Sequence, residues 1–298
     1  MMTPTHPAAA ASDRERAIRT IKILLFSASV VPSLVGGAIA HAAGSFAWTP
    51  FLLAAAGLFI GQAGGDYLYY YLTHFHSDAR DAHTKIFAGW RPLFTGMLLA
   101  PEKTVWAGAA CLLIDLAIAA YFVELRGAEI LWFALAGGLI AVFFTPLMLR
   151  GLKEPVIFVT FGPLCVTGVV FALTGTISGA AIVASLPVGF FVTVVAYLKS
   201  ARFDVVETGG EQVVVRLSRT VILALLALGY ASLAAGVALG RLPVWSLGGL
   251  LSLPLAWSVA SIVRQSSSKV TEYLWATVRS IVVLVIVGAG LAVGFMVS

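Results

Sequence analysis

Charged residues are scarce in this chain of 298 residues. Asp, Glu, Lys and Arg together make up 11% of it, whereas 60% is hydrophobic and the mean hydropathy is +0.97. Because soluble domains carry about 25% charged residues, this composition excludes a soluble globular protein of this size. Apolar runs reach the roughly 20 residues that a helix needs to cross a bilayer. We therefore expect an all-α, polytopic membrane protein.

Two further patterns are missing. Segments of about ten residues with alternating hydrophobicity, which outer-membrane barrels show, do not occur. The only cysteines, Cys111 and Cys165, stand singly inside apolar runs without CxxC spacing, which indicates small buried side chains rather than metal ligands.

The apolar runs predict nine transmembrane helices in a single domain over 21–298, after a tail at 1–20. Ala38-Ile39-Ala40 resembles a signal-peptide cleavage site, but the run is too long for a signal peptide and we expect a retained first helix. The nine expected spans cover about 21–41, 51–74, 103–123, 129–149, 155–174, 180–200, 218–239, 244–263 and 277–297.

The distribution of Lys and Arg predicts the orientation. With the amino terminus in the cytoplasm, sixteen of these residues fall in inside segments and only Arg126 and Arg241 in outside loops. This bias follows the positive-inside rule, and we expect a multi-pass protein of the inner (plasma) membrane with a cytoplasmic amino terminus. It also accounts for the basic excess, so no nucleic-acid partner is expected.

A first acidic patch lies where the second expected span ends. Asp66 stands near the end of the apolar run, and Asp78 follows in the next loop. Carboxylates at the ends of spans are costly unless they pair or bind a cation. Mg²⁺ is usually held by one or two carboxylates together with substrate phosphates, a requirement that Asp66 and Asp78 meet. The alternative is a polar helix end with solvated charges.

A second patch follows the sixth expected span, on the same membrane side. Asp204 and Glu207 are three residues apart, and on a helical turn they would share a face. Lys199 and Arg202 have the same spacing and are suited to holding a diphosphate. Alone, this patch is also consistent with an ordinary juxtamembrane charge cluster, but the two patches together favour a shared metal-diphosphate site.

Asp115 lies in the middle of the third expected span. An isolated ionisable group there is expensive. It lines a cavity or relays protons in one interpretation, and in the other it is protonated and bonded to a neighbouring helix.

These residues resemble the UbiA superfamily of intramembrane prenyltransferases, most nearly the menaquinone branch, 1,4-dihydroxy-2-naphthoate polyprenyltransferase. The resemblance covers about 19–218. It is carried by three stretches, Ser29-Val30-Val31-Pro32-Ser33-Leu34-Val35-Gly36, Gly89-Trp90-Arg91 through Gly96-Met97-Leu98, and Val213-Val214-Val215-Arg216-Leu217.

The acidic motifs depart from the family pattern. In the first, Gly65 and Tyr69 occupy positions where the family commonly has Asn and Asp. In the second, Lys199-Ser200 replaces a pair of Asn residues, and Gly209-Gly210-Glu211 lacks a lysine.

The resemblance implies a bundle of nine helices that transfers a polyprenyl group from its diphosphate to an aromatic acceptor such as 1,4-dihydroxy-2-naphthoate, for quinone biosynthesis. It also implies a role for each candidate residue. These are Asp66 and Asp204 as catalytic residues; Asp66, Asp78, Asp204 and Glu207 for Mg²⁺; Lys199, Arg202, Arg91 and Lys22 for the diphosphate; and Tyr69, Tyr70 and Asp115 in the substrate cavity.

Two alternatives remain. The altered motifs are compatible with cyclisation of an isoprenoid diphosphate or with transfer to another acceptor. They are also compatible with a membrane protein that has no catalytic activity.

Overall fold

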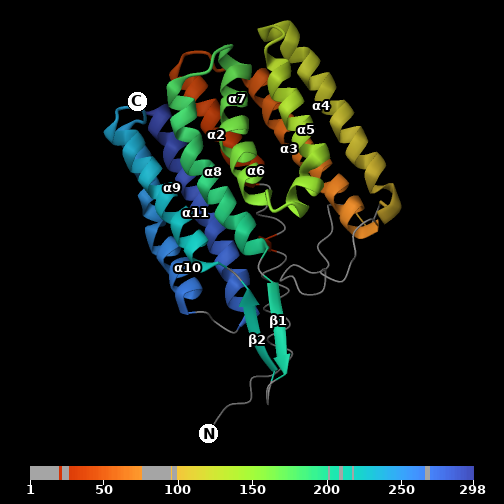
Figure 1. Cartoon of the computed structure of the whole chain (residues 1–298). Coiled ribbons are helices and arrows are strands. Elements are labelled where there is room, and N and C mark those ends of the chain that lie inside the picture. Colours follow the sequence, from red (N-terminus) through yellow and green to blue (C-terminus); the bar gives the residue numbers. More distant parts are fainter. Residues whose placement is uncertain are drawn as a thin grey trace.

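The computed structural model describes residues 20–21, 27–75, 95, 99–200, 202–207, 211–216, 218–265 and 269–298. Nine apolar helical segments form one bundle in this part of the chain (Figure 1). Eight are long and apolar enough to cross a membrane, and α2 is a shorter apolar helix. The segments are α2 (Ser27–Ala42), α3 (Trp48–Phe75), α4 (Thr104–Arg126) after the short η2 (Pro101–Lys103), α5 (Ile130–Leu149), α6 (Lys153–Val159) with η3 (Thr160–Leu164) and α7 (Cys165–Thr174), α8 (Gly179–Lys199), α9 (Arg219–Ala238), η4 (Val244–Ser252) with α10 (Leu253–Gln265), and α11 (Val270–Met296).

These segments match the nine spans expected from hydropathy, and the all-α polytopic fold class is confirmed. The last span is longer than expected, because α11 already begins at Val270. Hydropathy finds a span reliably because backbone polar groups must be bonded within the helix once they are in lipid. It does not fix where a helix ends outside the membrane.

The expectation of a helical turn at Asp204 and Glu207 is wrong. This segment forms an antiparallel hairpin of β1 (Arg202–Glu207) and β2 (Glu211–Arg216), in which Asp204 pairs with Val214. Both strands contain consecutive valines, and β-branched residues favour extended backbone. The hairpin follows α8 at one end of the bundle (Figure 1).

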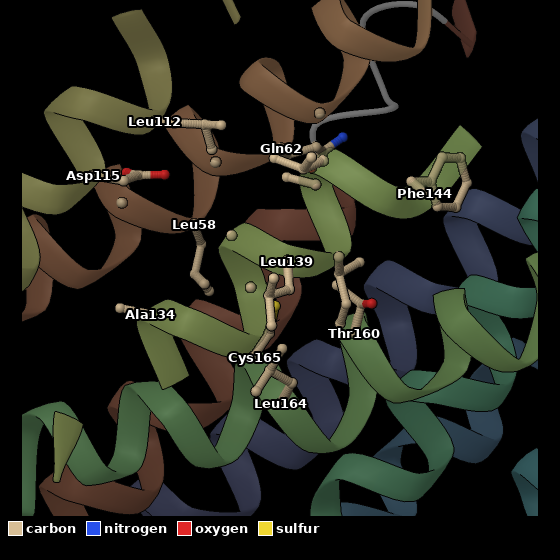
Figure 2. A pocket seen from close by; sticks show the side chains of 18 of the residues that line it. Leu58, Gln62, Leu112, Asp115, Ala134, Leu139, Phe144, Thr160, Leu164 and Cys165 are labelled. Carbon is tan, nitrogen blue, oxygen red and sulfur yellow. The ribbon is translucent and has the colours of Figure 1, made fainter. Parts of the chain in front are cut away.

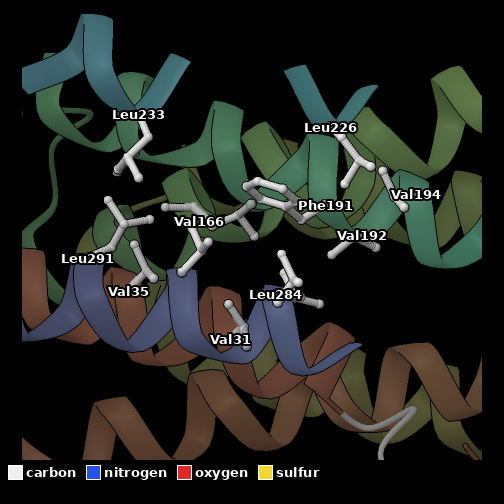
Figure 3. Close-up of a cluster of buried hydrophobic side chains, with 14 of the residues drawn as sticks. Val31, Val35, Val166, Phe191, Val192, Val194, Leu226, Leu233, Leu284 and Leu291 are labelled. Carbon is white, nitrogen blue, oxygen red and sulfur yellow. The ribbon is translucent and has the colours of Figure 1, made fainter. Parts of the chain in front are cut away.

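The bundle has a densely packed half and an open half. In the most apolar 18-residue windows, 67% of the residues of α8 and 56% of those of α11 are buried, against 11% in both α3 and α5. Phe191 of α8 lies at the centre of the dense half, among Leu226 of α9 and Leu284 of α11 (Figure 3). The open half carries the cavity described below.

A π-helical turn, η3, joins α6 to α7 at the point where they cross α8. A Cβ atom on Gly162 in this turn would lie 2.8 Å from both the Gly189 Cα and the Ser185 carbonyl oxygen of α8. The backbones therefore approach as closely as only glycine permits. This contact fixes the start of α6 beside the end of α8, where two lysines are found.

Candidate active site

A cavity of about 2150 Å³ opens between α3, α4, α5, α6–α7 and α8. Most of its wall is apolar, and each of these segments except α8 contributes leucine or phenylalanine side chains to it. Figure 2 shows Leu58, Leu112 and Leu139 on this wall, with the polar Gln62 and Asp115 among them. Charged and hydroxyl side chains gather where α3 and α8 end and α6 begins, which is also where the hairpin leaves the bundle.

Asp66 of α3 and Lys199 of α8 meet at this polar end. Both side chains are partly buried, both line the cavity, and the carboxylate and the ammonium interact electrostatically. Lys199 is the last residue of α8, so its charge also complements the negative end of that helix dipole. Two helices far apart in the sequence thus bring one anion and one cation to the same wall.

Lys153, the first residue of α6, adds a second cation. Its ammonium donates a hydrogen bond to the Ala196 carbonyl at 3.2 Å and another to the Ser200 hydroxyl. The Ser200 hydroxyl in turn donates to the Ala196 carbonyl at 2.9 Å. Lys153, Lys199 and Ser200 all line the cavity, so the polar end carries two ammonium groups.

Lys153 is not among the site residues expected from the sequence, in which it is one of the cations of the inside segments. Its proximity to Ser200 depends on the packing of α6 against α8, which spacing in one sequence does not reveal. Gln62 was missed too, although it stands one turn before Asp66 and therefore on the same face of α3. Its side chain is hydrogen-bonded to the Ser29 hydroxyl of α2.

The two tyrosines have different environments. Tyr69 lines the cavity, interacts electrostatically with Asp66, and packs edge-on against Phe144 of α5 with ring centroids 5.9 Å apart. Tyr70 also lines the cavity, but it is buried and stacked on His74, with ring centroids 5.2 Å apart and an interplanar angle of 11°. One face of Tyr70 is thus covered by His74.

Asp115 of α4 lies deeper in the cavity, opposite α3. A Cβ atom on Gly61 would be 2.7 Å from its Oδ2 atom, and its Oδ1 atom is buried without a hydrogen-bond partner among the described residues. The cavity-lining interpretation of Asp115 therefore agrees with the geometry, and a hydrogen bond from Oδ1 to a neighbouring helix is not found in the described residues.

The remaining candidate residues are described only in part or not at all. Asp78, Arg91 and Lys22 lie outside the described residues, and Arg202, Asp204 and Glu207 are described only as backbone positions of β1. A spacing of three places two positions on opposite faces of a strand, so the proposed common face does not exist for Asp204 with Glu207. Lys199 with Arg202 fails for a related reason, since one ends α8 and the other begins β1.

The donor set fits a magnesium ion that takes few ligands from protein. Among the described residues no group of three or more His, Cys, Asp or Glu side chains is placed to hold a metal. Asp66 is the carboxylate that the described residues bring to the polar end. Since Mg²⁺ is commonly held by one or two carboxylates with phosphates and water, Asp66 is compatible with such an ion.

Two comparisons with known proteins bear on the identity of the chain. The model of the UbiA prenyltransferase family matches residues 29–281, which is most of the chain. A comparison with curated proteins finds no significant match.

Proposed function

We propose a specific reaction for this chain, which belongs to the UbiA prenyltransferase family. It transfers a polyprenyl group from polyprenyl diphosphate to an aromatic acceptor resembling 1,4-dihydroxy-2-naphthoate, for quinone biosynthesis. Family membership itself implies prenyl transfer to an acceptor within a membrane. The large cavity in the described part of the chain supports this proposal, because it has two lysines and an aspartate at one end and an apolar wall over most of the rest.

The polar end suits the diphosphate. Lys199 and Lys153 supply positive charge where the leaving group accumulates negative charge, an arrangement that stabilises the transition state more than the ground state. The allylic C–O bond breaks with its electron pair on the diphosphate oxygen. The allylic carbon then bonds to a ring carbon of the acceptor, which loses a proton, or carbon dioxide where a carboxylate occupies that position.

Magnesium is the cofactor that we propose for this site, with Asp66 as its first protein ligand and Asp78, Asp204 and Glu207 as the other candidates. When bound, Mg²⁺ neutralises the diphosphate and assists its departure. Asp66 itself interacts with Lys199, so the same carboxylate positions one of the cations. Arg91, Arg202 and Lys22 remain further candidates for contacts with the diphosphate.

The apolar wall suits the prenyl chain and the cation that forms on it. Exclusion of water protects an allylic cation from hydrolysis, and Tyr69 offers an aromatic ring beside the polar end that attracts positive charge. Leu135 and Leu139 of α5 line the cavity and are about half exposed. We propose that a lipid substrate enters from the bilayer on this side.

The polar end then faces the cytoplasm, where water-soluble diphosphate products can leave. Lys153, Lys199 and the hairpin lie at this end of the bundle, in the segments that the positive-inside rule assigns to the cytoplasm. We accordingly propose the inner membrane as the location, with the amino terminus inside.

Incubation of the purified protein with radiolabelled farnesyl diphosphate and Mg²⁺ tests the proposal, with and without 1,4-dihydroxy-2-naphthoate. We expect a labelled naphthoate-derived product and release of diphosphate, both lost in Asp66→Asn and retained in Glu124→Gln, which alters an exposed carboxylate outside the cavity. A labelled hydrocarbon formed without acceptor would identify a cyclase instead. Absence of diphosphate release under all these conditions would contradict an enzyme of this kind.

A further inference from the structure

Asp115 lies against a pair of glycines that leave room for its carboxylate. A Cβ atom on Gly61 would come within 2.7 Å of Oδ2, and one on Gly57 within 3.7 Å of Oδ1. All three residues line the cavity. A larger residue at position 61 would require the Asp115 side chain to move, so α3 and α4 together provide a fitted recess for a carboxyl group within the span.

Among the described residues, the recess offers no hydrogen-bond donor to the Oδ1 atom of Asp115. The titratable group that interacts with Asp115 is the Cys111 thiol one turn earlier on α4. Ionisable groups within a span are expensive and usually face a partner or a ligand, and a buried oxygen without a hydrogen bond requires an explanation. A purely structural role would require a protein partner for Oδ1.

The position of Asp115 separates it from the diphosphate end. Gly61 precedes Asp66 by five residues on α3, which places the recess about 7 Å further into the membrane at a rise of 1.5 Å per residue. Apolar side chains that line the cavity near it include Leu112 of α4 and Leu58 of α3 (Figure 2). Ile118 of α4 lies beside Gly57 of the same recess. A planar ring fits beside such side chains, with one polar substituent directed at the carboxylate.

We infer that Asp115 binds the aromatic acceptor, with Oδ1 accepting a hydrogen bond from a free hydroxyl group on the ring. The ligand class is a hydroxyl-bearing aromatic molecule, and an ether of the same ring lacks the required hydrogen. This inference rests on the proposed function in one respect, which is that the aromatic ligand is the acceptor of the prenyl group. The binding itself requires no turnover.

A matched pair of probes tests it, namely 1-naphthol and 1-methoxynaphthalene, in which a methyl group replaces the hydroxyl hydrogen that 1-naphthol would donate to Oδ1. Calorimetric titration of the full-length protein in phosphatidylcholine nanodiscs gives both dissociation constants. We expect wild type to bind 1-naphthol roughly tenfold or more tightly than the ether, the scale of a hydrogen bond to a charged group. In Asp115→Leu the ratio should fall to about one, since only the hydrogen bond is lost.

Two further variants control the result. Glu124→Gln removes an exposed carboxylate from the same helix outside the cavity and should keep the wild-type ratio. Gly61→Ala keeps the Asp115 carboxylate but displaces it, so the ratio should fall without any loss of charge. This variant also decides the matter if Asp115→Leu fails to fold.

Equal affinity of wild type for the two probes, or an unchanged ratio in Asp115→Leu or in Gly61→Ala, would overturn the inference. The outcome is independent of prenyl transfer. A protein that prefers naphthol through Asp115 but transfers no farnesyl group would refute the proposed function alone. One that transfers the group and shows no preference would refute only the role of Asp115.

Discussion

Asp66 on α3 and Lys199 at the end of α8 interact electrostatically at the polar end of the cavity. Both residues line the cavity wall, and both side chains are partly buried. Asp66 belongs to the first charged patch of the sequence and Lys199 to the second, so the cavity brings these two distant patches together. Both residues line the end of the cavity at which we expect the diphosphate.

Replacement of Lys199 should weaken the binding of prenyl diphosphate more than it weakens the fold. We expect Lys199→Met to raise the dissociation constant for farnesyl diphosphate by roughly tenfold to a hundredfold, the scale of a charge-assisted hydrogen bond. Lys199→Arg keeps the charge and should lose much less. Equal affinities of Lys199→Met and wild type, measured by titration calorimetry, would contradict this role.

Lys153 and Ser200 should behave as one unit in stability. Lys153→Met and Ser200→Ala each remove the same hydrogen bond, so we expect each to lower the free energy of unfolding by about 1 kcal/mol and the double variant to lower it by less than the sum. Denaturant titration in mixed micelles measures the four values. Strict additivity would show that the two side chains are not coupled.

The close contact at Gly162 should be intolerant of any side chain. In Gly162→Ala the new Cβ atom meets the backbone of Gly189 and Ser185 at 2.8 Å, and the strain should cost about 1–3 kcal/mol. Gly138→Ala is the matched control, because a Cβ atom there has no neighbour within 4 Å. Thermal unfolding should separate the two variants clearly, and a similar midpoint for both would argue against this packing of η3 on α8.

Removal of divalent cations should abolish the reaction. With EDTA we expect no diphosphate release, and titration of Mg²⁺ should restore it in wild type but not in Asp66→Asn, since one carboxylate ligand is lost. Full activity in EDTA would mean that Lys153 and Lys199 neutralise the leaving group without a metal.

The membrane spans and two of the carboxylates in the cavity could be predicted from the sequence, but the way in which the helices bring these carboxylates together could not. The spans followed from hydropathy, because a helix is the structure that satisfies its own backbone in lipid. Asp66 and Asp115 could be singled out because a carboxylate inside an apolar run is expensive. Their placement on one cavity wall depends on which faces of α3 and α4 pack together, and a single sequence does not encode that visibly.

The errors have physical reasons too. The helical spacing assigned to Asp204 and Glu207 failed because the valines of β1 and β2 favour an extended hairpin. Lys153 was overlooked because its partner Ser200 comes from a different helix. A lysine at the start of one span and a serine just after another gave no local pattern that would connect them.

A structure of the protein with farnesyl thiolodiphosphate, whose C–S bond resists cleavage, would show directly where the prenyl diphosphate binds. We expect the diphosphate beside Lys153, Lys199 and Asp66, with the farnesyl chain along the apolar wall between α3 and α5. A diphosphate bound elsewhere, or a chain directed away from this cavity, would contradict it.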